Sequence, residues 1–175
     1  MPIDYFRETK PLGTVGSLAL IDHLDADTLV MNGDILTDLD YGAMLADHRN
    51  GDACLTIATR VRQVEITLGV PQFADGDLTR VTGFVEKPRI DYRASMGVFC
   101  VSPHAIDYID PGERLDLPDL VLRLIDRDQV VRAWISDDYW LDIGQHDDYE
   151  RALAEFEKVE HRLLPEPGPP LSPRS

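Results

Sequence analysis

Basic residues are scarce in this chain of 175 residues. Lys and Arg together number 17 against 32 Asp and Glu, which gives a formal net charge of −15. This balance argues against a protein that binds nucleic acid through the phosphate backbone, because such binding needs a basic face. It argues equally against one that binds anionic membranes. A small anionic ligand held by a few placed cations, or by a metal ion, stays compatible with the composition.

Cysteine and long hydrophobic runs are also scarce. Cys54 and Cys100 stand far apart with no CxxC or Cys/His cluster, so a structural zinc site is not expected. Each lies in an apolar run, which predicts a buried thiol and fits a reducing compartment. No run approaches the roughly 18 apolar residues of a membrane span, and residues 1–11 have no signal-peptide pattern. We therefore expect a cytoplasmic protein with no membrane partner.

Proline is concentrated at one end, because residues 165–175 hold five of the 12 prolines. This stretch has little to bury and cannot form a helix or a central strand. We expect a folded domain over residues 1–164 and a disordered Pro-rich tail over 165–175.

The remaining pattern predicts an α/β fold. Apolar runs typical of covered strands alternate with helix-spaced segments in the first third of the chain, which favours a parallel sheet flanked by helices. The middle predicts an antiparallel excursion with a turn at Asp75-Gly76. The expected strands are 3–6, 28–31, 53–59, 68–73, 78–86, 95–101, 130–135 and 139–141. Helices are expected over 14–24, 41–49 and 146–163, with two more beginning near Pro103 and Pro118.

Two aspartates follow expected strands, where ligands bind in open α/β sheets. Asp34 ends the segment Asn32-Gly33-Asp34, and Asp142 lies in the aromatic run YWLDIG. Two acids on different strand ends are able to share one Mg²⁺, which prefers oxygen ligands. The alternatives are a solvated turn residue for Asp34 and a capping residue for Asp142.

Three further segments have residue types suited to ligand binding. Glu86 and Lys87 leave a strand together before Pro88, where Lys suits a phosphate and Glu suits hydroxyl groups; taken by itself, the pattern favours the alternative of a surface ion pair. The loop PLGTVG at 11–16 leads into an expected helix, whose N-terminus can face an anion. Glycines in or beside expected strands, Gly69 and Gly97, allow a ligand close to the backbone.

Six segments in order resemble the sugar-1-phosphate nucleotidyltransferases, a family that includes mannose-1-phosphate guanylyltransferases and glucose-1-phosphate thymidylyltransferases. These segments are E…PLGTVG, LVMNGDILTDLD, GFVEKP, ASMGVF, GERLDLPDL and YWLDIG. The resemblance covers about residues 3–159. It implies a Rossmann-like mixed, mostly parallel sheet flanked by helices. It also implies transfer of a nucleotidyl group from a nucleoside triphosphate to a sugar-1-phosphate, with release of pyrophosphate.

The resemblance also implies roles for individual residues. Asp34 and Asp142 match the aspartates that hold Mg²⁺, and Lys87 matches the lysine on the sugar phosphate. The residues that match substrate contacts are Leu12, Gly13, Gly69, Glu86, Ser95, Met96 and Gly97.

One departure from the family pattern is large. The family opens with a glycine-rich GxGTRL-type loop and a PKP lysine, roughly 80 residues ahead of the segment that begins here at Glu8. We expect the first βα units to be missing, so that the domain is N-terminally incomplete. A fragment, a misplaced start codon and half of a split protein all fit this. We therefore expect negligible turnover by the chain alone, and weak stability or self-association through an exposed edge of the strand 28–31.

Two other functions compete with this interpretation. A related metal-dependent glycosyltransferase would use the D-x-D pattern of Asp38 and Asp40. A non-catalytic sugar-phosphate-binding module would need no glycine-rich loop.

Overall fold

The computed structural model describes residues 3–22, 24–144 and 146–164. Its centre is a four-stranded sheet in the order β1-β6-β3-β7, formed by Thr28–Met31, Arg89–Val101, Leu55–Glu65 and Val131–Ile135. Strand β6 pairs antiparallel with both β1 and β3, whereas β3 and β7 are parallel. Three strands therefore run in one direction, with β6 reversed between two of them.

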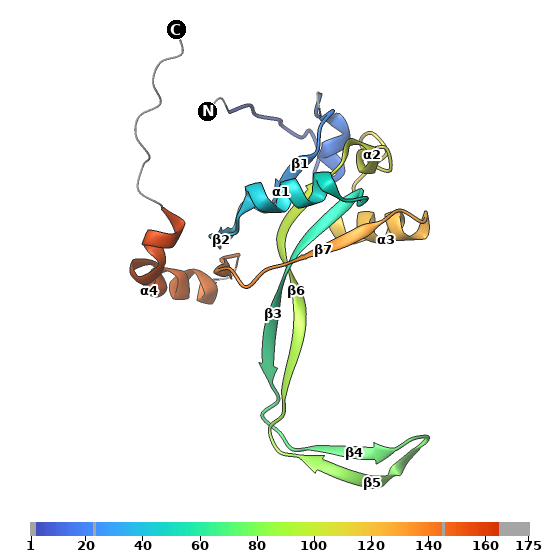
Figure 1. Ribbon diagram of the computed structural model, residues 1–175, viewed down its shortest axis with the longest axis vertical. Coiled ribbons are helices and arrows are strands. Elements are labelled where there is room, and N and C mark those ends of the chain that lie inside the picture. The colour runs from blue at the N-terminus through green and yellow to red at the C-terminus, as the bar shows by residue number, and fades with distance from the viewer. Residues whose placement is uncertain (1–2, 23, 145, 165–175) are drawn as a thin grey trace.

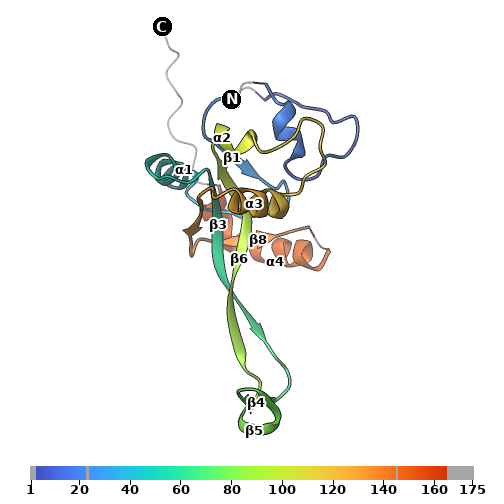
Figure 2. The same ribbon diagram turned by 90° about the vertical axis from the view of Figure 1, so that its right-hand side faces the viewer.

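Helices cover both faces of this sheet (Figures 1 and 2). Alternate residues of β6 show why, because successive side chains of a strand point to opposite faces. Phe99 and Val101 pack in one cluster with Leu120 and Leu124 of α3 (Leu117–Asp126). The same cluster contains residues of η1 (Gly16–Leu20) and of α2 (Pro103–Ile106).

The second cluster lies on the opposite face. It contains Val98 and Cys100 of β6 together with Met44 of α1 (Tyr41–Asn50). Helix α1 begins at Asp40, whose side chain accepts a hydrogen bond from the N–H of Ala43 at 2.8 Å.

A long arm projects from this body (Figure 1). Strand β7 accompanies β3 only as far as Thr59, and the arm continues as β3 paired with β6, from Arg60 opposite Ala94 to Glu65 opposite Arg89. At its far end lies the hairpin of β4 (Val70–Ala74) and β5 (Asp77–Val85). We call residues 60–65 and 89–95 the stem, and β4 with β5 the tip.

A small ribbon lies at the edge of the body. Strands β2 (Ile35–Thr37) and β8 (Trp140–Asp142) pair antiparallel with Ile35 opposite Asp142. Helix α4 (His146–Leu163) follows β8. None of the helices among the described residues is long and apolar enough to cross a bilayer.

The structure confirms the mixed α/β class and corrects several details. The strand pairings are mainly antiparallel rather than parallel, because the hairpin at the tip turns the chain back along β3. Residues 3–6 form no strand, and the helix expected over 14–24 is only the short 3-10 helix η1. Strand β2 was not predicted. The predicted tail at 165–175 lies outside the described residues.

Candidate functional site: an acid pair beside a cleft

The ribbon of β2 and β8 brings Asp34 and Asp142 together. Asp142 lies opposite Ile35, and the N–H of Ile143 donates to the backbone oxygen of Asp34 at 2.9 Å. Gly144 lies between the two carboxylates. A Cβ atom on Gly144 would lie 2.8 Å from Asp34 Oδ2 and 3.2 Å from Asp142 Oδ1. Both carboxylates therefore border the space beside Gly144, which stays open because Gly144 has no side chain.

This acid pair has the chemistry of a Mg²⁺ site. Both aspartates are exposed, and Asp142 Oδ1 also accepts a hydrogen bond from the N–H of Gly144 at 2.9 Å. No group of three or more His, Cys, Asp or Glu residues within the described ranges is placed to hold a metal ion. Two carboxylates fit Mg²⁺ nevertheless, since this ion is usually bound by one or two carboxylates together with waters and substrate phosphates.

A cleft of about 260 Å³ opens beside the acid pair. Asp142 lines it, and so do the predicted substrate residues Ser95, Met96 and Gly97. The cleft is also lined by residues outside the predicted set of site residues: Thr14, Asn32, Ile35, Phe99, Leu117, Pro118 and Trp140. The aromatic residue directly before Leu141-Asp142 was the available signal for Trp140.

The segment Ser95–Gly97 is held rigidly at the cleft. The indole N–H of Trp140 donates to the carbonyl of Met96 at 2.8 Å, and the N–H of Asn32 donates to the carbonyl of Gly97 at 3.0 Å. Gly97 has φ +71°, and a Cβ there would lie 2.7 Å from Ile35 Cδ1. Any other residue would be strained at this φ, and its Cβ would push the Ile35 side chain aside. Gly97 therefore sets the close approach of β6 to the strand that follows Asp34.

The glycine-containing loop closes the other side of the cleft. Its Thr14 lines the cleft and accepts a hydrogen bond from the N–H of Leu117 at 2.8 Å. Gly13 has φ +78°, and a Cβ there would lie 2.5 Å from the carbonyl oxygen of Leu115. Leu12 is only 2% exposed. The two segments PLGT and RLDLP, more than a hundred residues apart in the chain, thus hold each other.

The structure leaves the other predicted residues far from the acid pair. Gly69 and Glu86 are neighbours where the stem joins the tip, and a Cβ on Gly69 would lie 2.8 Å from Glu86 Oε2. Lys87 follows in a turn with φ +46°. The stem separates Lys87 from the cleft, because Arg89 and Ser95 are already six residues of extended strand apart, or about 20 Å. The predicted site is therefore divided between the cleft and the arm.

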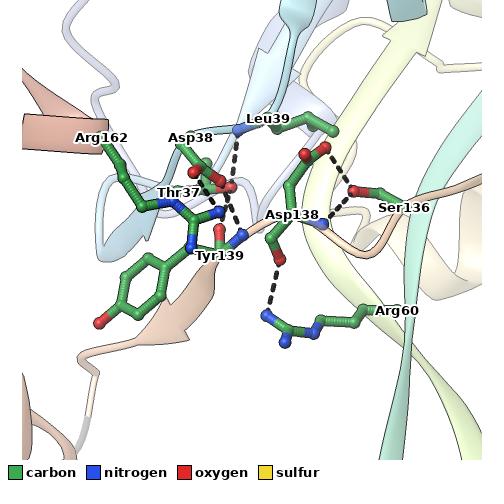
Figure 3. Close-up of polar contacts among 8 residues, drawn as sticks. All are labelled: Thr37, Asp38, Leu39, Arg60, Ser136, Asp138, Tyr139 and Arg162. Carbon is green, nitrogen blue, oxygen red and sulfur yellow. Dashed lines mark hydrogen bonds and ion pairs between the residues drawn. The ribbon is translucent and has the colours of Figure 1, made fainter. Parts of the chain in front are cut away.

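The aspartates of the D-x-D pattern have structural partners, and Figure 3 shows those of Asp38. Asp38 forms an ion pair with Arg162 of α4 at 2.5 Å and accepts from the N–H of Tyr139 at 2.6 Å. Asp40 is the cap of α1. Both residues tie elements together, and this observation speaks against a glycosyltransferase metal site here.

The two thiols are not activated nucleophiles. Burial raises the pKa of Cys54 above its usual value and raises that of Cys100 to about 11. Both cysteines are buried and free, as predicted. A reaction at the cleft would have to proceed without a thiolate.

The fold and the acid pair at a strand end define an α/β protein of the kind that binds ligands beyond the ends of its strands. Comparison with known proteins makes this specific, because residues 1–159 match the family model described as nucleotidyl transferase. The chain belongs to this family.

Curated relatives support this assignment. The chain is 31% identical over 168 residues to UTP–glucose-1-phosphate uridylyltransferase of Synechocystis sp., covering 91% of this chain and 43% of the relative. It is 29% identical over 158 residues to mannose-1-phosphate guanyltransferase of Yarrowia lipolytica, covering 84% and 42%. The chain therefore spans less than half the length of these relatives.

A solved structure agrees as well. The crystal structure of HddC from Yersinia pseudotuberculosis matches with a TM-score of 0.57 and 26% identity, covering 85% of this chain and 64% of that chain.

Proposed function

We propose that this chain supplies the metal-binding and sugar-binding part of a site that transfers a nucleotidyl group to a sugar-1-phosphate. The substrates are a nucleoside triphosphate and a sugar-1-phosphate, and the products are a nucleotide-activated sugar and pyrophosphate. The convergence of Asp34 and Asp142 on the empty side of Gly144, at the edge of a cleft, is the observation that carries this proposal.

The reaction fits the groups available at the cleft. An oxygen of the sugar phosphate attacks the α-phosphorus of the triphosphate in line, a new P–O bond forms, and the bond to pyrophosphate breaks. Such a transfer needs positioning and charge neutralisation and no protein nucleophile. Bound Mg²⁺ would neutralise charge on the phosphates. Asp34 and Asp142 would hold it, while the backbone of Ser95–Gly97 and the rim formed by Thr14 would orient the sugar.

Other parts of the assignment remain proposals. Lys87 and Glu86 are proposed to bind the sugar phosphate and sugar hydroxyls, Gly69 to lie against the sugar, and Leu12 and Gly13 to meet the nucleobase. We place the activity in the cytoplasm. Strand β1 is an edge strand among the described residues, and self-association through that edge stays a prediction.

A single added methyl group tests the metal site. Gly144→Ala would place its Cβ between the carboxylates of Asp34 and Asp142, so we expect Mg²⁺ affinity to fall at least about tenfold, as in Asp34→Asn and Asp142→Asn. Gly33→Ala is the matched control, because nothing lies within 4 Å of its added Cβ. Isothermal titration with Mg²⁺ alone measures the effect. Equal affinity in Gly144→Ala and Gly33→Ala would contradict the site.

Activity is tested separately. Pyrophosphate release from a triphosphate and a sugar-1-phosphate should be measured with the chain alone and with an added N-terminal segment from a relative. We expect release only with the added segment, and loss of it in Asp142→Asn. Sugar-1-phosphate binding without release in both cases would favour the non-catalytic binding module.

A further inference from the structure

The stem exposes two unpaired strand edges. Strand β1 pairs with β6 only from Val98 to Val101, so within the described part of the chain the outer edge of Arg89–Ser95 has no neighbouring strand. A two-stranded ribbon is marginal in water, and a free edge of this length is a template for another strand.

The stem also exposes apolar side chains to water, which is unfavourable. Val64 and Ile90 lie opposite each other and are 46% and 47% exposed. Tyr92 is 48% exposed on the same face. Adding a strand beside β6 would cover part of this surface and pair the free backbone groups.

The sequence of β6 is complementary to itself in one register. Two copies of one edge strand can pair antiparallel around a two-fold axis that is perpendicular to the sheet. Such an axis keeps each side chain on its own face of the sheet, so the axis passes beside one residue, which lies opposite the same residue of the other copy. A centre at Asp91 or Arg93 sets like charges opposite each other. A centre at Ile90 leaves only three residues of β6, 89–91, paired. A centre at Tyr92 pairs all seven residues from 89 to 95.

The register centred on Tyr92 has favourable pairs throughout. Asp91 of each copy lies opposite Arg93 of the other, which gives two ion pairs. Tyr92 opposes its own copy, and Ile90 opposes Ala94. Opposite-charge and aromatic cross-strand pairs of this kind stabilise a sheet.

We propose that a second copy of this chain docks on the stem, with the two β6 strands antiparallel and Tyr92 at the two-fold axis. The result is a continuous four-stranded stem in the order β3-β6-β6-β3. This interface is separate from the edge of β1.

Cysteine cross-linking tests the register without any activity. Tyr92→Cys should form a disulfide-linked dimer under mild oxidation, because the two Cβ atoms are opposite each other. Ile90→Cys is the matched control on the same face with nearly equal exposure, and its two copies would lie four residues apart, about 13 Å. A mixture of Arg89→Cys and Ser95→Cys chains should cross-link with each other. The parent chain, whose cysteines are buried, reports the background.

Charge exchange tests the interface in solution. Sedimentation velocity of the parent chain should show a dimer, and Asp91→Lys should raise its dissociation constant at least about tenfold because Lys would face Arg93 of the other copy. The exchange Asp91→Arg with Arg93→Asp in one chain should restore dimerisation. Met31→Lys, on the edge of β1, should leave it unchanged.

Several outcomes would overturn the proposal. A parent chain that is monomeric at all concentrations would do so. Cross-linking of Ile90→Cys as efficient as that of Tyr92→Cys would establish a different register. Dimerisation lost in Met31→Lys but kept in Asp91→Lys would move the interface to β1. None of these results bears on Mg²⁺ binding by Asp34 and Asp142, so failure here is distinguishable from failure of the proposed function.

Discussion

The body and the arm of this molecule share the strands β3 and β6, which are buried in the body and exposed to solvent in the arm. Where β3 and β6 cross the body they are flanked by β7 and β1, and Leu55, Val98 and Val101 are completely buried. Past Thr59 no third strand pairs with them within the described residues, and only Arg60 and Arg62, at the start of the stem, contact Asp138 and Trp140 of the body. The hydrophobic residues of the stem and tip are largely exposed. Strand pairing therefore gives most of the arm its shape, whereas helix packing gives the body its stability.

The sharpest contrast is expected between two leucine truncations. Leu120→Ala removes a fully buried side chain of α3 and should lower the free energy of unfolding by about 2–5 kcal/mol. Leu78→Ala, at a position 80% exposed on the tip, should change it by less than about 0.5 kcal/mol. Urea unfolding followed by circular dichroism measures both. Equal losses would mean that the arm folds as part of the core.

Two glycines with similar positive φ angles separate backbone strain from crowding by neighbouring atoms. Gly97 and Gly76 have φ +71° and +77°, so alanine at either costs about 1–2 kcal/mol of backbone strain. Only at Gly97 does the added Cβ meet another atom, Cδ1 of Ile35 at 2.7 Å. Gly97→Ala should therefore lower the urea midpoint by more than Gly76→Ala. The opposite ranking would show that the contact between β6 and β2 is loose.

The body also contains a buried histidine that makes its stability depend on pH. His48 is 4% exposed and shares a hydrogen bond of 2.8 Å with Thr56, and burial lowers its pKa despite the nearby carboxylate of Asp27. The unfolded state then binds a proton more readily than the folded state, so stability is lost as the pH falls below about 6.5. Urea midpoints between pH 7.5 and 5.5 should decline less in His48→Gln. Parallel declines would exclude His48 as the cause.

The smallest effect is expected where α4 joins the ribbon. Arg162 pairs with Asp38, whose side chain is 13% exposed, and lies over the ring of Tyr139 at 6.0 Å (Figure 3). Arg162→Ala should cost no more than about 1 kcal/mol in urea unfolding, because the arginine itself is 44% exposed. Asp38→Ala should cost more, since it also removes the acceptor for the N–H of Tyr139. A larger loss in Arg162→Ala would mean that α4 is part of the core.

Local periodicity predicted much of the body. The run TLVM and the segment Tyr41–Arg49 became β1 and α1 with nearly the expected bounds, and Pro118 lies in the first turn of α3. These elements have one face to bury, so their sequences carry a period. The segment Thr14–Leu24 has helix-like spacing but only a 3-10 helix forms, because its neighbours Gly13 and Thr14 are held against Leu115–Leu117.

The tip of the arm was predicted, because the turn at Asp75-Gly76 and the runs on either side of it became the hairpin of β4 and β5, whereas the stem was not predicted. Residues 60–65 (RVRQVE) alternate irregularly, whereas residues 89–94 (RIDYRA) alternate strictly between charged and apolar or aromatic types, a strand signal that the sequence reasoning missed. The acid pair was within reach, because Asp34 and Asp142 each follow a strand run. The separation of Lys87 from that pair was not, since it depends on the length of the stem. The positions of Gly144 and Trp140 at the site depend on the pairing of β2 with β8, which the sequence does not reveal.

The pairing of β2 with β8 also governs when the proposed metal site can form. The hydrogen bond from Thr37 to Tyr139 spans 102 residues of sequence, and the carboxylates of Asp34 and Asp142 meet only through that ribbon. During synthesis the chain must leave the ribosome to a point beyond Gly144 before the proposed metal site can form. A nascent chain arrested earlier would lack the proposed Mg²⁺ site, and Mg²⁺ binding would first become possible when β2 and β8 have paired.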